Sequence, residues 1–223
     1  MQNTRIYPLL TGVDYIDYLG QLHKQIHPEW YFEIGSFKGD SLEVSRSKSI
    51  AVDPKFNLSS TSISGKPELH LFQMTSDDFF ESNKLSNLAP KIDLAFLDGM
   101  HLFEYLLRDF IGTEKHCSNS SVIVLHDCIP ISEIASQRER CPGSWTGDVW
   151  KLVPILRKYR PDLAIQIMDC PPSGLTVIRN LDSSNRVLSG NYNQIVEEFL
   201  DETISTFGKN NLSESLKIES SRQ

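Results

Sequence analysis

Two aspartates and two histidines follow apolar runs in this sequence at spacings that favour a shared chemistry. Asp98 directly follows one apolar run and His101 stands three residues later, whereas His126 and Asp127 directly follow another run. A histidine with an ordinary pKa near ~6.5 can accept a proton at neutral pH. Because buried charge is costly without a partner or a use, these residues predict a site of acid–base or metal chemistry. Alternatively, His101 caps the next helix or orients Asp98, and His126 only forms hydrogen bonds across the strand ends.

A glycine-containing turn and a further acidic residue predict a nucleotide-type ligand. Residues 33–39 read Glu-Ile-Gly-Ser-Phe-Lys-Gly, in which Gly35 lets the chain turn tightly and Gly39 lets a helix begin close to a ligand. Asp53 ends the next apolar run, where a carboxylate can accept hydrogen bonds from both hydroxyls of a ribose. The turn lacks the GxGxxG spacing that receives a pyrophosphate, so a ligand without one fits better. An ordinary strand-to-helix turn and a turn residue before proline are the alternative interpretations.

Alternating strand and helix patterns predict the elements that must position these residues. Strands are expected at 30–34, 49–52, 69–74, 92–97 and 121–125, followed by an antiparallel hairpin at 163–168 and 174–178. Helices are expected at 13–22, 41–47, 103–111, 149–156 and 195–207. Strands separated by helices indicate βαβ units. The predicted fold class is therefore α/β, with a Rossmann-like, doubly wound, mostly parallel seven-stranded sheet, helices on both faces and an antiparallel C-terminal hairpin strand.

The composition favours a cytoplasmic enzyme or binding protein. The 223 residues carry 22 Lys and Arg against 29 Asp and Glu, which gives a net charge of −7, and 39% of them are hydrophobic. No stretch approaches the ~18 apolar residues of a membrane helix, and residues 1–10 lack the pattern of a secretory signal. The acidic balance disfavours nucleic-acid binding. The cysteines lack zinc-ligand spacing and are expected to be buried thiols.

Taken together, the motifs resemble those of class I S-adenosylmethionine (SAM)-dependent methyltransferases. The first motif of that class is an acidic residue followed by GxxxG, and the second is the acidic residue that closes strand two. Residues 92–101 (IDLAFLDGMH) and 122–127 (VIVLHD) are similar to the branch that methylates hydroxyls of small molecules and sugars, including macrolide sugar and novobiocin-type methyltransferases. The resemblance extends over residues 30–179.

The resemblance implies a role for each candidate residue. His101 would be the catalytic base that accepts the proton of an acceptor hydroxyl, with Asp98 beside it. Asp98, His126 and Asp127 would hold a metal ion; because His126 adds a nitrogen ligand, the set suits Mn²⁺, Fe²⁺ or Zn²⁺ as well as Mg²⁺. The residues expected to bind the methyl-donor cofactor are Glu33, Gly35, Ser36, Gly39, Asp53, Thr75, Ser76 and Asp98.

The resemblance also sets the expected domain organisation. Residues 1–207 would form a single class I methyltransferase domain, and residues 208–223, rich in Ser, Asn, Lys and Glu, would be a disordered tail. The domain would consist of an N-terminal helical segment, a cofactor-binding sheet and a terminal helix, at 1–29, 30–180 and 190–207.

The segment from 129 to 145 has no clear period, which is typical of a lid or substrate loop. Its Arg138 and Arg140 either attract an anionic acceptor or stay solvated. Trp145 and Trp150 either border an acceptor pocket or pack in the core.

The expected function is transfer of a methyl group from SAM to a small-molecule acceptor, with a hydroxyl oxygen as the methylated atom. The sequence leaves open whether Mg²⁺ or Mn²⁺ is required, whether the protein forms homo-oligomers, and which acceptor it takes. Two other functions compete with this one. An NAD(P)-dependent oxidoreductase is disfavoured by the missing GxGxxG, and a catalytically silent nucleotide-binding module of the same fold stays open.

Overall fold

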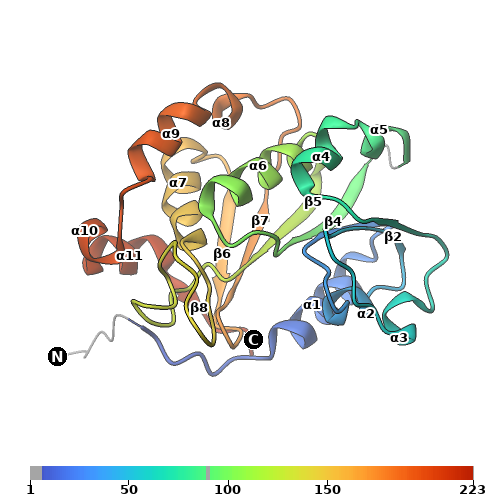
Figure 1. The fold of residues 1–223 in the computed structure, drawn as a ribbon, viewed down its shortest axis with the longest axis horizontal. Coiled ribbons are helices and arrows are strands. Elements are labelled where there is room, and N and C mark those ends of the chain that lie inside the picture. The colour runs from blue at the N-terminus through green and yellow to red at the C-terminus, as the bar shows by residue number, and fades with distance from the viewer. Residues whose placement is uncertain (1–6, 89–90, 223) are drawn as a thin grey trace.

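A mixed sheet forms the centre of the computed structural model, which describes residues 7–88 and 91–222 (Figure 1). Within these residues the sheet has eight strands in the order β3-β2-β1-β4-β5-β7-β6-β8. Strands β1 to β5 pair in parallel, whereas β7 is antiparallel to both β5 and β6. The strands are β1 (Trp30–Ile34), β2 (Lys48–Val52), β3 (Leu69–Phe72), β4 (Ile92–Leu97), β5 (Cys117–His126), β6 (Ala164–Met168), β7 (Leu175–Arg179) and β8 (Ile218–Glu219).

Helices cover both faces of the sheet, and each face has its own apolar core. Strand β1 is buried along its whole length because alternate side chains enter the two cores: Phe32 faces one and Tyr31 the other. The core beneath α1 is the smaller. The helices are α1 (Tyr15–Ile26), α2 (Asp40–Glu43), α3 (Ser60–Ile63), α4 (Ser76–Glu81), α5 (Lys84–Leu88), α6 (Phe103–Glu114), α7 (Leu152–Tyr159), α8 (Val187–Gly190), α9 (Tyr192–Phe199), α10 (Ile204–Phe207) and α11 (Lys209–Leu216), with a 3₁₀ turn at Val149–Lys151.

The predicted fold class is confirmed, and the sheet gains one strand beyond the seven expected. The extra strand, β8, lies in the segment 208–223, for which the sequence predicts disorder. The structure differs there because Leu212 and Leu216 on α11 are buried in the larger core and β8 pairs with β6. The polar composition of this segment does not reveal that it is ordered, because two apolar side chains are enough to dock an otherwise polar helix. The domain limits expected from the sequence stay a prediction.

The carboxyl ends of the parallel strands lie at one edge of the sheet, together with three connecting segments (Figure 1). These segments are the N-terminal stretch before α1, the loop 127–148 and the hairpin connection 169–174. Gly12 N donates to Asp169 O at 3.1 Å and Tyr15 N donates to Pro171 O at 3.3 Å, so the N-terminal stretch is fastened to the hairpin. None of the helices in the described part of the chain has the length and apolar content needed to cross a membrane.

Candidate functional site

Four ionisable side chains meet at the carboxyl ends of β4 and β5: Asp98, His101, His126 and Asp127, here named the Asp/His cluster. Nε2 of His101 lies 3.4 Å from Asp98 Oδ1, and its Nδ1 lies 3.3 Å from Asp127 Oδ2. Nδ1 of His126 lies 3.3 Å from Asp98 Oδ2 and 3.4 Å from Asp127 Oδ1. Each histidine therefore stands between two carboxylates. These distances exceed those of good N–H···O hydrogen bonds, so the groups attract one another without closing tightly.

Local backbone geometry explains why these side chains converge. Strands β4 and β5 are neighbours in register, and alternation along β5 sends Val124 and His126 to the face covered by α1. Asp127 then adopts a φ of 61°, a left-handed conformation that costs a non-glycine residue about 1–2 kcal/mol. Strain of this kind persists where surrounding contacts enforce it. The conformation brings Asp127 within 3.3 Å of His101, which is presented by the turn before α6.

The cluster sets the charge of its own members. Burial alone would lower the pKa of His101, but contact with Asp98 and the charge of Asp127 raise it to about 9. Burial would likewise lower the pKa of His126, and the charges of Asp98 and Asp127 raise it to about 9. Burial raises the pKa of Asp127, whereas the histidines outweigh burial at Asp98 and lower its pKa to about 2. Without a ligand, both histidines are therefore protonated at neutral pH.

The loop 127–148 fixes the orientation of His101. Its Nδ1 lies 2.9 Å from the carbonyl oxygen of Trp145, so this nitrogen carries a proton and Nε2 faces Asp98. The rings of His101 and Trp145 stack with centroids 5.3 Å apart, and Arg140 lies over the Trp145 ring at 5.8 Å. Gly147 is required beside this contact, because a Cβ there would come within 1.7 Å of the His101 carbonyl oxygen.

Arg138, one of the two arginines considered from the sequence for binding an anionic acceptor, instead forms ion pairs within the protein. Its guanidinium binds Glu104 at 2.6 Å and Asp148 at 2.8 Å, and Asp148 also binds Lys151 at 2.9 Å. Asp148 and Lys151 are fully buried. This network anchors the loop to α6, because breaking a buried ion pair strands the remaining charge. Arg140 makes no ion pair among residues 7–88 and 91–222.

Two residues that contact the Asp/His cluster were not predicted from the sequence. Ser173, in the hairpin connection, donates a hydrogen bond to Asp127, and its hydroxyl lies 3.4 Å from Nε2 of His126. Tyr15, at the start of α1, covers His126 with ring centroids 4.4 Å apart. Nothing in the sequence marks either residue, since their proximity depends on how β7 and α1 return to the strand ends.

The glycine turn lies beside the cluster. Gly35 has a φ of +88°, and a Cβ at this position would come within 1.9 Å of the Asp98 carbonyl oxygen. Glycine therefore allows the end of β1 to approach the turn after β4. Glu33, just before it, is fully buried: it accepts from the Tyr31 hydroxyl at 2.5 Å and from Ser41 at 3.0 Å. Burial raises the pKa of Glu33 to about 7, and its position favours holding the turn over direct contact with a ligand.

Asp53 ties the glycine turn to β2. Its Oδ2 accepts from the backbone N–H of Phe37 at 2.9 Å, and its Oδ1 accepts from that of Lys55 at 2.7 Å. A carboxylate has about four acceptor positions, so two remain for a ligand. Ser36, in the same turn, has a buried hydroxyl oxygen without a hydrogen-bond partner in the described chain.

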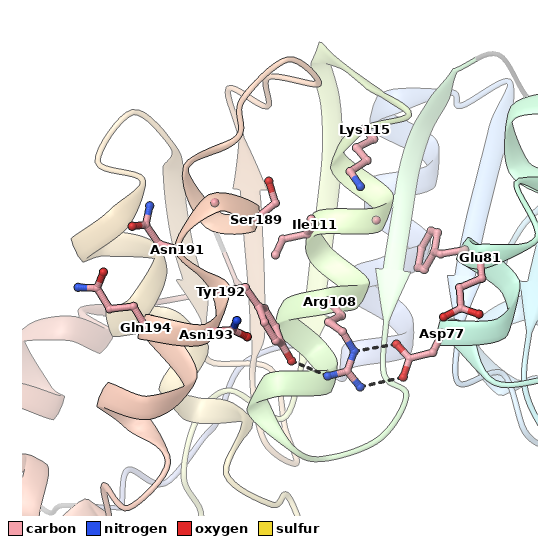
Figure 2. A pocket seen from close by; sticks show the side chains of 13 residues that line it. Asp77, Glu81, Arg108, Ile111, Lys115, Ser189, Asn191, Tyr192, Asn193 and Gln194 are labelled. Atoms are coloured by element: carbon pink, nitrogen blue, oxygen red, sulfur yellow. Dashed lines mark hydrogen bonds and ion pairs between the residues drawn. The ribbon is translucent and has the colours of Figure 1, made fainter.

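Thr75 and Ser76 follow β3 and lie at the N-terminal end of α4. Thr75 caps the helix, accepting from Asp78 N at 3.2 Å. Asp77 forms a two-bond contact with Arg108, at 2.7 and 2.8 Å. Figure 2 shows Arg108 between Asp77 and Tyr192, at one end of a groove of about 520 Å³ between α4, α6 and the α8–α9 region. Arg108 is paired with Asp77 and also donates to the Tyr192 hydroxyl, so its own charge is already matched within the groove.

Within residues 7–88 and 91–222, one group could hold a metal ion: Asp98, His101 and Asp127, with one ligand atom of each within 4.8 Å of the others. The sequence favours His126 for this set. His101 meets this distance condition with the two aspartates, while Nδ1 of the buried His126 lies 3.3 Å from Asp98 and 3.4 Å from Asp127, and the metal role expected for His126 stays a prediction. Carboxylate oxygens with one imidazole nitrogen suit Mn²⁺ and Zn²⁺ as well as Mg²⁺.

Comparison with known proteins relates part of the chain to methyltransferases. Residues 32–128 match a family described as a methyltransferase domain. No curated protein matches the chain. With this match, the fold confirms the resemblance to class I SAM-dependent methyltransferases, whose Rossmann-like sheet the chain shares.

Solved structures of this class share the fold at low sequence identity. The O-methyltransferase TomG from Streptomyces achromogenes, involved in tomaymycin synthesis and solved with SAM, is 14% identical, covers 75% of this chain and 79% of its own, and has a TM-score of 0.54. An O-methyltransferase from Bacillus cereus in complex with SAH (S-adenosylhomocysteine) is 12% identical over 78% and 84%, with a TM-score of 0.53. The SAH-bound methyltransferase PaMTH1 from Podospora anserina is 14% identical over 75% and 78%, with a TM-score of 0.51.

Proposed function

We propose that this protein is a SAM-dependent methyltransferase that transfers a methyl group to a hydroxyl oxygen of a small-molecule acceptor. The observation that carries the proposal is the Asp/His cluster, which lies beside the glycine turn at the strand ends. Methyl transfer to a hydroxyl needs both of these features: the turn can receive the methyl donor, and a histidine of the cluster can accept the proton. The O-methyltransferase structures that share the fold support the same choice of acceptor atom.

The residues at the turn fit the methyl donor. Gly35 and Gly39 give the turn its left-handed backbone, the buried hydroxyl of Ser36 lacks a partner in the described chain, and Asp53 keeps two acceptor positions for ribose hydroxyls. Glu33 would contribute indirectly, by holding the glycine turn in position. Thr75 and Ser76 would border the adenine from the start of α4. When bound, SAM supplies a methyl group on a positively charged sulfur.

His101 would accept the proton of the acceptor hydroxyl at Nε2. Its Nδ1–H is already donated to the carbonyl oxygen of Trp145, so a protonated ring would be stabilised from both sides. The raised pKa of His101 depends on Asp98 and Asp127. A cation close to these carboxylates would offset their charge and lower that pKa, which would free Nε2 to act as a base at neutral pH.

A divalent metal would use Asp98, His101 and Asp127. The same nitrogen of His101 cannot serve as base and ligand at once, so metal dependence decides which role it has. Calorimetric titration of the purified protein with Mn²⁺, alongside activity with and without EDTA, distinguishes the two. Binding of Mn²⁺ with loss of activity in EDTA supports the ligand role. Full activity in EDTA supports the base role.

One experiment tests the function against its alternatives. The purified protein is titrated with SAH, SAM and NAD while its melting temperature is measured, and it is then incubated with methyl-labelled SAM and an extract of its own host. We expect stabilisation by SAH and SAM, and label in a small-molecule ether. Stabilisation by NAD alone would indicate an oxidoreductase, and SAH binding without any methyl transfer would indicate a silent binding module.

A further inference from the structure

Tyr15 lies at the Asp/His cluster, and the proposed chemistry gives it no role. It is the first residue of α1, and its ring lies 4.4 Å from that of His126, tilted by 32°. The same ring stacks at 6.5 Å on Phe96 of β4, whose ring in turn lies 6.0 Å from that of His126. Tyr15 therefore covers the strand ends from the α1 side.

The Tyr15 hydroxyl is placed among carboxylates without bonding to one. Within residues 7–88 and 91–222 it makes no hydrogen bond, and the residue is partly exposed. Burial and the negative charges of Asp98 and Asp40 raise its pKa to about 12, so it remains a hydrogen-bond donor. Asp98 follows β4 and Asp40 begins α2, directly after Gly39 of the glycine turn. The hydroxyl thus stands near the turn proposed to hold the methyl donor.

Both chain ends fix the position of Tyr15. Val13 N donates to the Ser221 hydroxyl at 2.7 Å, and Ser221 N donates to Asp169 Oδ1 at 2.6 Å. Ser221 is buried, and a Cβ at Gly12 would come within 2.0 Å of its hydroxyl oxygen. The C-terminal residues, together with the hairpin connection, therefore hold the stretch that leads into α1.

We propose that Tyr15 contacts the amino-acid end of the methyl donor, with its hydroxyl donating to the donor's carboxylate and its ring closing the site over His126. This inference rests on the proposed function. The acidic residues nearby suit an ammonium group and a sulfonium, but they offer no donor for a carboxylate. The Tyr15 hydroxyl supplies that donor, and its ring shields the site from water.

The test uses two ligands that differ only at the amino-acid end. SAH carries the carboxylate, whereas 5′-methylthioadenosine keeps the adenosine and sulfur and lacks it. Dissociation constants for both are measured by calorimetry with the full-length protein and with Tyr15→Phe. We expect Tyr15→Phe to weaken SAH binding by about 10-fold, the loss of one hydrogen bond to a charged group, and to leave binding of 5′-methylthioadenosine unchanged.

Two further variants control for effects on the helix. Tyr18→Phe removes a hydroxyl one turn along α1, on a side chain that packs in the core beneath α1 away from the cluster, and should leave SAH binding unchanged. Ser221→Ala should weaken SAH binding about two- to threefold by loosening the stretch before Tyr15. Equal weakening of both ligands in Tyr15→Phe, or no weakening of SAH, would overturn the inference. Failure of the unmodified protein to bind SAH would instead overturn the proposed function.

Discussion

Two histidines with the same exposure, 8% each, lie against tyrosine rings in different regions of the molecule, and one is protonated at neutral pH whereas the other is neutral. His126, in the Asp/His cluster, lies under Tyr15, and the charges of Asp98 and Asp127 outweigh burial and raise its pKa to about 9. His23, on α1, lies 4.6 Å from the ring of Tyr31, and neither of its nitrogens has a hydrogen-bond partner in the described chain. Burial, with smaller effects of Lys66 and Arg46, lowers its pKa to about 4.

The difference shows that partners, and not depth, decide the charge of a buried histidine. His23 faces no carboxylate, so it stays neutral and packs as part of the α1 interface. In the Asp/His cluster each histidine nitrogen lies 3.3–3.4 Å from a carboxylate oxygen, which is close enough for charges to attract and too long for good hydrogen bonds. Because the ionisable side chains of the cluster do not form tight hydrogen bonds with one another, a bound ligand can change which of them are protonated and which of them pair. The predictions below test this contrast.

The largest effect is expected from His101→Ala. Loss of the proposed base should lower kcat/KM for methyl transfer by about 10²- to 10⁴-fold, and the melting temperature is measured alongside to confirm that the variant folds. Steady-state kinetics with labelled SAM measure the loss. His116→Ala, at the end of α6 and outside the cluster, serves as the control and should keep full activity. Equal activity of the two variants would contradict the role of His101.

His23 should make the protein sensitive to acid. Its folded pKa of about 4 lies below the unfolded value of 6.5, so the unfolded chain binds more protons between these values and stability falls as pH falls. The loss between pH 7 and pH 4 should reach about 3 kcal/mol. His23→Phe should remove this part of the pH dependence. Urea unfolding of both proteins at several pH values measures it, and identical slopes against pH would refute the assignment.

The smallest effect concerns Ser173. Its hydroxyl donates to the buried Asp127, so Ser173→Ala should lower the free energy of unfolding by about 2 kcal/mol. Ser49→Ala is the matched change outside the cluster, since the buried Ser49 hydroxyl bonds only neutral oxygens, at 2.9 and 3.0 Å, and should cost about 1 kcal/mol. Chemical unfolding of both variants compares the two. A larger loss for Ser49→Ala would mean that Asp127 does not depend on Ser173.

Sequence patterns predicted the strands of the site well, because each strand is a local property. The apolar runs that end at Leu97 and Leu125 place Asp98 and His126 at one edge of a parallel sheet. The glycine turn was equally visible, since Gly35 and Gly39 are needed for left-handed backbone. The tail was misjudged because its polar composition outweighs the two leucines that dock α11.

The sequence by itself determined the α/β fold and the residues that follow each strand, since both depend on periods of two and 3.6 residues along the chain. Only the tertiary structure decided which of those residues meet. His101 joins Asp127 because the turn before α6 and the left-handed residue after β5 face each other. Ser173 and Tyr15 arrive from β7 and α1, whose return to the strand ends depends on packing between distant segments and leaves no local pattern.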